Sequence, residues 1–175
     1  MEGLKEKIRN IPNFPQKGIL FKDITTLLSD RKAYNKAIDI LKDRYIDMHI
    51  DLVVCIEARG FVIGGALAYG LNSGVTLIRK PGKLPYTTYK DSYELEYGRN
   101  EIEIHTDAIK PGQRVLIVDD LLATGGTVGA AIELVKRLDG EIVELAFLIE
   151  LTFLNGRERL KDYNIYSLIQ FGKEE

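Results

Sequence analysis

"VLIVDDLLATGGT", residues 115–127, is the stretch that decides the fold. Four apolar residues run directly into two adjacent acids, Asp119 and Asp120, and a small turn with paired glycines follows. A short apolar run rich in β-branched residues is typical of a strand that is covered on both faces. We therefore expect a buried strand that ends at two carboxylates and continues through a loop into a helix.

The rest of the chain repeats this alternation of strand and helix. A capping signal at Ser29 and Asp30 precedes apolar residues at helical spacing, which predicts an amphipathic helix over residues 30–47. Strand, helix and strand in succession predict an α/β fold with a central, mostly parallel sheet flanked by helices. With 175 residues, the chain is expected to form a single domain. The predicted strands are 52–56, 75–78, 114–118 and 142–149, and the helices between them are 60–70 and 127–138.

The composition excludes several classes of protein. Hydrophobic residues make up 45% of the chain, charged residues 29%, and the net charge is -2, so we expect no nucleic-acid partner. The apolar runs are far shorter than a bilayer span, and the charged start lacks the pattern of a secretory signal. The lone Cys55, within "LVVCI", is interpreted as a core residue and not as a catalytic thiol. We expect a soluble, cytoplasmic protein without a membrane partner.

Two segments depart from the α/β pattern. Residues 11–28, "IPNFPQKGILFKDITTLL", contain two prolines and a glycine before a strand-like run. Residues 80–99 form a polar excursion that is longer than most structural connections. The tyrosines of this excursion also suit a surface helix, but Pro85, Gly98 and the threonine pair oppose one, so we favour a mobile lid. These tyrosines are Tyr86, Tyr89, Tyr93 and Tyr97.

The acids and the glycine turn predict a ligand site. Ligands of open α/β sheets bind beyond the carboxyl ends of the strands, where at least one of the two acids should face the crevice. The helix after the turn offers unpaired N–H groups and a positive dipole end to an anion. Gly125 and Gly126 allow close approach of the backbone, and Thr124 and Thr127 add hydroxyl donors. It is not a Walker loop, because no lysine follows the glycines.

Carboxylates beside a phosphate site would repel a phosphate that touched both. A sugar phosphate removes the conflict, because the loop takes the 5-phosphate while Asp119 and Asp120 accept hydrogen bonds from ribose hydroxyls. The carboxylates also favour positive charge at the anomeric carbon, as develops in glycosyl transfer. Two alternatives remain at this point: an acid pair that holds Mg²⁺ in a receiver-like domain, and a plain solvated turn.

The thirteen-residue run resembles the phosphoribosyl-diphosphate motif of type I phosphoribosyltransferases. Three further segments resemble the adenine-specific members: residues 11–28, "IEARGFVIGGALA" (56–68), and "LIRKPGKLP" (77–85) with "YELEYG" (93–98). The resemblance implies the type I phosphoribosyltransferase fold over residues 1–175, with a small hood at about 1–28 and a flexible lid loop at about 80–99. It also implies purine salvage, in which the 5-phosphoribosyl group of phosphoribosyl diphosphate moves to N9 of adenine, giving AMP and pyrophosphate.

The same resemblance implies roles for individual residues. Arg59 suits a diphosphate because its guanidinium is forked and always charged, although it could also form a surface ion pair. The ribose 5-phosphate site comprises Asp119, Asp120, Ala123, Thr124, Gly125, Gly126 and Thr127. The pyrophosphate site comprises Glu57, Ala58, Arg59, Arg79, Lys80 and Lys83, with a cis peptide expected between Glu57 and Ala58. Some of the three basic residues after position 78 could instead be solvated surface charges.

For the base, the resemblance assigns main-chain groups of Leu20 and Lys22, with Phe21 stacked on one face of adenine and Leu151 on the other. Phe21 and Leu151 could otherwise be ordinary core residues. The catalytic residues are Glu96, for proton handling at N7 of the base, Tyr97, for support in the closed lid, and Arg59. Glu96 could instead be a solvated residue of the lid.

Mg²⁺ is expected as the cofactor, held mainly by diphosphate, ribose hydroxyls and water, so no metal ligand is assigned to the protein. His49 and His105 match no motif and are interpreted as surface residues. The resemblance implies a homodimer with contacts near residues 56–68 and 77–85. Two alternative functions remain: transfer to xanthine, guanine or orotate, and a non-enzymatic regulator that senses phosphoribosyl diphosphate.

Overall fold

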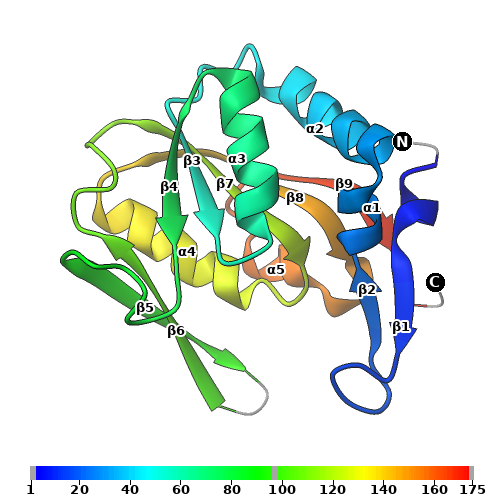
Figure 1. Ribbon diagram of the computed structural model, residues 1–175. Coiled ribbons are helices and arrows are strands. Elements are labelled where there is room, and N and C mark those ends of the chain that lie inside the picture. Colours follow the sequence, from blue (N-terminus) through cyan, green and yellow to red (C-terminus); the bar gives the residue numbers. More distant parts are fainter. Residues whose placement is uncertain (1–2, 96–97, 174–175) are drawn as a thin grey trace.

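The computed structural model describes residues 3–95 and 98–173, which are built around one parallel sheet (Figure 1). Its five strands lie in the order β4-β3-β7-β8-β9, and every neighbouring pair runs parallel. The predicted α/β fold with a parallel central sheet is therefore confirmed. The last strand lies outside the four that the apolar runs predicted. The strands are β3 Leu52–Ile56, β4 Gly74–Ile78, β7 Arg114–Leu122, β8 Glu141–Leu151 and β9 Ile165–Phe171.

Helices cover both faces of this sheet. The helix predicted at residues 30–47 is α2, Arg31–Tyr45, and the Asp30 side chain accepts hydrogen bonds from the Lys32 and Ala33 amides at its start. α2 packs with α3 (Gly60–Leu71) on one face, while α4 (Gly126–Arg137) covers the other. The remaining short helices are η1 Lys5–Lys7, α1 Thr25–Ser29, η2 Thr152–Leu154 and α5 Gly156–Arg159.

Two hydrophobic clusters explain why the strands read as continuous apolar runs. In β3, Val53 and Cys55 point into the cluster with α2 and α3, whereas Val54 and Ile56 point into the cluster with α4. Successive strand residues face opposite sides, so a strand covered on both faces has no exposed positions to fill with polar residues. The sheet is thus a rigid support whose strand ends can carry a site.

Cys55 belongs to this core, as predicted. Its side chain is fully buried, and burial, with a further contribution from the Asp119 charge, raises the pKa of the thiol to about 12. A thiol with so high a pKa is a poor nucleophile, which agrees with a packing role. Of the two histidines, His49 is exposed, while His105 is half-buried and its Nε2 accepts the Tyr86 amide at 3.4 Å.

Among the described residues, no helix has both the length and the apolar character that crossing a bilayer requires.

The hood predicted near residues 1–28 is a small unit beside the main sheet. β1 (Arg9–Pro12) and β2 (Leu20–Asp23) form a separate antiparallel pair (Figure 1). The Arg9 guanidinium, together with Thr25, holds the pKa of the Asp23 carboxyl down at about 2. The Arg9–Asp23 ion pair joins the first residue of β1 to the last residue of β2.

The segment at residues 80–99 is not the surface helix that its tyrosines also suited. β5 (Thr88–Leu95) pairs with β6 (Gly98–His105) in an antiparallel hairpin, so most of the expected lid has regular structure. Its role as a lid stays a prediction. Tyr89 and Tyr93 pack against the cluster that contains α4. A spacing of four places two side chains on one face of a strand as well as on one face of a helix, so the tyrosine spacing could not distinguish the two.

Candidate active site

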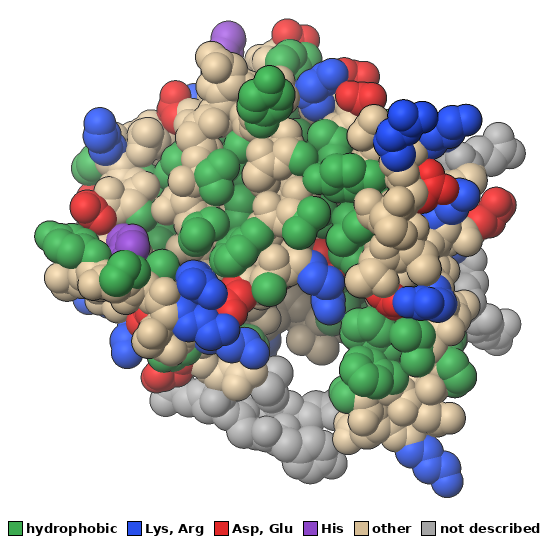
Figure 2. All heavy atoms as spheres, in the orientation of Figure 1, with side chains coloured by type: hydrophobic (Ala, Val, Ile, Leu, Met, Phe, Trp, Pro, Cys, Tyr) green, Lys and Arg blue, Asp and Glu red, His purple; other side chains and the backbone are tan. Residues whose placement is uncertain are grey.

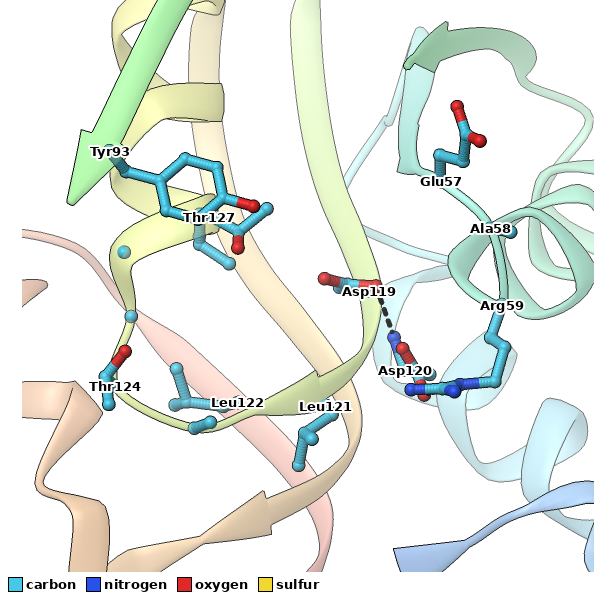
Figure 3. Close-up of a pocket in the computed structure, with 14 residues that line it drawn as sticks. Glu57, Ala58, Arg59, Tyr93, Asp119, Asp120, Leu121, Leu122, Thr124 and Thr127 are labelled. Carbon is cyan, nitrogen blue, oxygen red and sulfur yellow. Dashed lines mark hydrogen bonds and ion pairs between the residues drawn. The ribbon is translucent and has the colours of Figure 1, made fainter. Parts of the chain in front are cut away.

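A cavity of about 330 Å³ opens at the carboxyl ends of β3 and β7 (Figure 3). This volume lies at the lower end of the usual range for small-molecule sites. The lining comes from three separate parts of the chain, namely the turn after β3, the hairpin, and the end of β7 with the loop into α4. The lining residues are Glu57, Ala58, Arg59, Tyr93 and the continuous run Asp119 to Val128.

Both acids of the opening motif line this cavity, as predicted. β7 continues to Leu122, so the acids lie within the strand and not just beyond its end, which corrects the predicted boundary at residue 118. Asp119 and Asp120 are only 9% and 6% exposed, and Asp119 Oδ1 accepts the Asp120 amide at 2.8 Å. In Figure 3, the Asp120 carboxylate turns toward Arg59, while Asp119 projects toward the side of the cavity that holds Thr127.

The environment of Asp119 disfavours its charged form. Burial raises the pKa of the Asp119 carboxyl well above its usual value, and the neighbouring charge of Asp120 raises it further. A ligand hydroxyl that donates to this carboxylate supplies the hydrogen bond that water no longer provides. The acid pair therefore favours a ligand with several hydroxyl groups over a second anion.

The loop after β7 forms the opposite wall. Gly125 has φ +79° and caps the start of α4, and Gly126 begins the helix. Helix N-termini present unpaired N–H groups and a positive dipole end, which bind anions. Residues 121–128 contain no charged side chain, so the backbone amides with Thr124 and Thr127 provide the polar groups here. The structure thus brings together in one cavity the two walls that the sequence predicted, the acid pair for hydroxyl groups and the loop for an anion. Their binding roles stay predictions.

The turn after β3 carries the predicted arginine. The peptide bond between Glu57 and Ala58 is cis, as expected. Arg59 donates from Nε to Asp120 Oδ2 at 2.5 Å, and its guanidinium lies 5.5 Å from the ring centre of Phe21 in the hood. Arg59 therefore does form an ion pair, but its partner is the cavity acid Asp120 and not a surface acid elsewhere. Arg59 links the acid pair to the hood.

The basic turn after β4 is held by Glu57. Glu57 accepts hydrogen bonds from Arg79 Nε at 3.2 Å, from the Lys80 amide at 3.0 Å and from Lys83 Nζ at 2.5 Å. Burial alone would raise the pKa of Glu57, but Lys83, the Lys80 amide and Arg79 together hold it below its usual value. Of the six predicted pyrophosphate residues, Glu57, Ala58 and Arg59 line the cavity. Arg79, Lys80 and Lys83 lie beside it, outside the set that lines it.

The predicted base-binding residues also lie outside the lining. Leu20 is 41% exposed and Phe21 is half-buried, which leaves apolar surface on the hood, while Leu151 at the end of β8 is half-buried against the core. Lys22 is buried, donates to Asn10 Oδ1 at 2.8 Å and lies 4.3 Å from the Phe171 ring centre. Its ammonium group is thus occupied, which agrees with a role for its main chain alone.

Tyr93 is a lining residue to which sequence reasoning gave no site role. It reaches the cavity from β5, and in Figure 3 its ring lies beside Thr127. The sequence could have indicated Tyr93 by its position four residues after Tyr89, which places both side chains on the hairpin face that packs toward α4. Glu96 and Tyr97, predicted as catalytic, lie outside the described residues, and their roles stay predictions.

Comparisons with known proteins place this chain in a family. The profile named "Phosphoribosyl transferase domain" matches residues 23–173. Adenine phosphoribosyltransferase of Trichlorobacter lovleyi is 59% identical over 98% of this chain and 100% of its own length. The crystal structure of adenine phosphoribosyltransferase from Thermoanaerobacter pseudethanolicus superposes with a TM-score of 0.93 at 54% identity, covering 96% of this chain and 98% of that one. The enzyme from Saccharomyces cerevisiae, solved in a complex that includes adenine, gives 0.89 at 41% identity, with 94% and 96% covered.

The chain therefore belongs to the phosphoribosyl transferase family, and the resemblance drawn from its motifs is confirmed. Within that family, the relatives to which it is similar over nearly its full length include the adenine phosphoribosyltransferases named above.

Proposed function

We propose that this protein transfers the 5-phosphoribosyl group from phosphoribosyl diphosphate to N9 of adenine, giving AMP and pyrophosphate for purine salvage. The observation that carries the proposal is the single cavity in which a buried acid pair faces a loop of uncharged backbone donors. A phosphorylated pentose satisfies both walls at once. The names of the full-length relatives support adenine as the acceptor.

The sugar phosphate binds across the two walls. The 5-phosphate accepts hydrogen bonds from the amides of residues 123–127, helped by the dipole of α4. Ribose hydroxyls donate to Asp119 and Asp120, which are held rigidly because they are part of β7. Negative charge on the acid pair stabilises the positive charge that develops at the anomeric carbon of the ribose.

Pyrophosphate leaves toward the turn after β3. A bond forms between N9 and the anomeric carbon while the carbon–oxygen bond to pyrophosphate breaks, and its electron pair leaves with pyrophosphate. Arg59 and the basic turn of Arg79, Lys80 and Lys83 stabilise the leaving anion. Arg79 and Lys83 contact Glu57 in this structure, so the leaving group competes with that carboxylate for them.

The donor set fits a Mg²⁺ ion that arrives with the diphosphate. Mg²⁺ prefers oxygen ligands, which Asp119 and Asp120 could offer, but Asp120 already pairs with Arg59. Across residues 3–95 and 98–173, no group of three or more His, Cys, Asp or Glu is arranged to hold an ion. When bound, the ion neutralises charge on the leaving group. The acids of this chain orient the ribose instead of enclosing the metal.

Adenine is placed between the hood and the end of β8. Phe21 covers one face of the ring and Leu151 the other, while main-chain groups of Leu20 and Lys22 recognise its edge. Stacking of this kind contributes about 1–3 kcal/mol per base. The contact of Arg59 with Phe21 supports this arrangement, because it brings the hood beside the turn assigned to pyrophosphate. The base loses its proton at N7 as N9 bonds to the anomeric carbon, and Glu96 accepts that proton with support from Tyr97.

A panel of bases tests the proposal. Purified protein, phosphoribosyl diphosphate and Mg²⁺ are incubated with adenine, guanine, xanthine, hypoxanthine or orotate, and nucleotide and pyrophosphate are quantified. Product from adenine supports the proposal. Product from another base alone shows a phosphoribosyltransferase with a different acceptor, and binding of phosphoribosyl diphosphate without turnover shows a sensor.

The enzyme is also proposed to act as a cytoplasmic homodimer. Large apolar side chains are exposed on α3 and β4, including Val62 at 46%, Tyr69 at 91%, Val75 at 46% and Leu77 at 37%. Figure 2 shows hydrophobic side chains spread over this face, which overlaps the predicted contact regions 56–68 and 77–85. Sedimentation equilibrium of the parent and of Val62→Glu measures the association. A mass near one chain, 19.7 kDa, for the parent would contradict the dimer.

A further inference from the structure

The turn that follows β8 contains residues that the proposed reaction leaves without a role. Leu151 is assigned to the base, but the rest of the sequence "LTFLNGRE", residues 151–158, is not. In the structure Asn155 has φ +53°, and Gly156 is buried at the start of α5. This turn, residues 155–159, lies directly against the loop that forms the anion-binding wall of the cavity.

The contact is made by backbone on both sides. A Cβ atom built on Gly156 would lie 2.3 Å from the Ala123 carbonyl oxygen and 2.9 Å from Leu122 Cδ1. A Cβ atom built on Gly125 would lie 2.9 Å from the Gly156 carbonyl oxygen. Neither of these two backbone segments can therefore accept even a methyl group unless the other segment moves. Gly156 is thus packed against the loop whose amides are assigned to the 5-phosphate.

An ion pair fixes the turn to the sheet. Arg157 donates two parallel hydrogen bonds to Glu150 of β8, at 2.8 and 2.7 Å, and a third to the Ile165 carbonyl oxygen at 3.2 Å. Glu150 is only 4% exposed. Forked pairs of this kind constrain geometry as well as adding energy. Leu160 is also buried and would lie 3.4 Å from a Cβ atom on Gly125, so it supports the same loop.

We propose that residues 155–159 are a positioning element for the 5-phosphate loop, in which Gly156 sets the depth of the anion site and the Glu150–Arg157 pair holds Gly156 in place. The inference rests on the proposed function, because it assigns the anion at this loop to phosphoribosyl diphosphate. Backbone donors bind an anion well only where their positions are fixed before it arrives. A shift of the Ala123 carbonyl turns the neighbouring amides away from the phosphate.

The decisive variant is Gly156→Ala, with Gly129→Ala as the matched control. Gly129 lies in α4, and a Cβ atom there meets no heavy atom within 4 Å. For Gly156→Ala we expect KM for phosphoribosyl diphosphate to rise about 10- to 100-fold, since displacements near 1 Å have effects of this size. We expect KM for adenine to change much less, because the atoms nearest to a Cβ on Gly156 belong to Leu122 and Ala123 and not to Leu151. Calorimetric binding of ribose 5-phosphate should weaken in parallel, and Gly129→Ala should change neither quantity.

The ion pair provides a second test that does not depend on the packing of Gly156. Arg157→Gln should raise KM for phosphoribosyl diphosphate more than KM for adenine, and Arg157→Lys should recover part of the loss. If Gly156→Ala does not fold, as judged by circular dichroism, the two Arg157 variants decide. Equal changes of both KM values, or none, in folded variants would overturn the inference. A parent protein that makes no nucleotide would instead overturn the proposed function.

Discussion

Replacing Asp120 by Asn tests the assignment of the acid pair. The substitution keeps the size of the side chain and removes one negative charge from the cavity. Asp120 is 6% exposed and contacts Arg59, so the carboxylate is held in place before a ligand binds. If a ribose hydroxyl donates to it, the variant loses a hydrogen bond to a charged acceptor.

The two expected effects differ in size. A hydrogen bond to a charged group contributes about 1.5–3 kcal/mol, and each 1.4 kcal/mol is about a factor of ten in affinity. The Kd for phosphoribosyl diphosphate should therefore rise about 10- to 150-fold. The stability change should be small, because the Arg59 side chain is 44% exposed, and such pairs contribute about 0–1 kcal/mol. In a chain of this size, that corresponds to a shift of at most about 4 °C in Tm.

Initial rates give kcat and KM for each substrate, calorimetry gives Kd, and thermal unfolding gives Tm. The parent and Lys32→Gln, a change at a surface position of α2, are measured beside the variant. An unchanged Kd for phosphoribosyl diphosphate, with normal folding, would show that the acid pair does not hold the ribose. A large loss of Tm with unchanged affinity would show that the acid serves stability alone.

Three further predictions address stability and charge. Asp119→Asn should raise Tm relative to the parent by an amount that grows with pH. Burial raises the folded-state pKa of Asp119 above its unfolded value near 3.9, so the parent loses stability as pH rises through the raised pKa. A difference in Tm that is constant from pH 4 to 9 would contradict this. Gly64→Ala should cost about 1–3 kcal/mol, because its Cβ would lie 2.2 Å from Cys55 Sγ, and denaturant unfolding of the double variant with Cys55→Ala should recover most of it. Glu57→Gln should lower the inhibition constant of pyrophosphate by up to about fivefold, because it removes the part-exposed ion pair with Lys83 and leaves Lys83 free to bind pyrophosphate. Weaker inhibition would show that Glu57 helps to bind the leaving group.

Some features of the fold were predictable because their signals are local. Apolar runs identified β3, β7 and β8, since strands covered on both faces exclude polar residues. An apolar run also identified β4 at the edge of the sheet, although its Val75 and Leu77 are exposed. β9, "IYSLIQF", was missed because polar residues interrupt its apolar run at the edge of the sheet. The hairpin was missed because the spacing of four between Tyr89 and Tyr93 fits a strand as well as a helix.

The sequence by itself determined the two walls of the cavity. Asp119, Asp120 and the glycine turn are neighbours along the chain, so a strand followed by a helix places them together whatever the remaining residues do. Partners that are distant along the chain were decided only by the tertiary structure. Arg59 meets Asp120 across 61 positions, Lys83 meets Glu57 across 26, and Gly156 packs against Ala123. Such contacts depend on how the strands are ordered and how closely two backbones approach, and no local spacing in the sequence encodes either quantity.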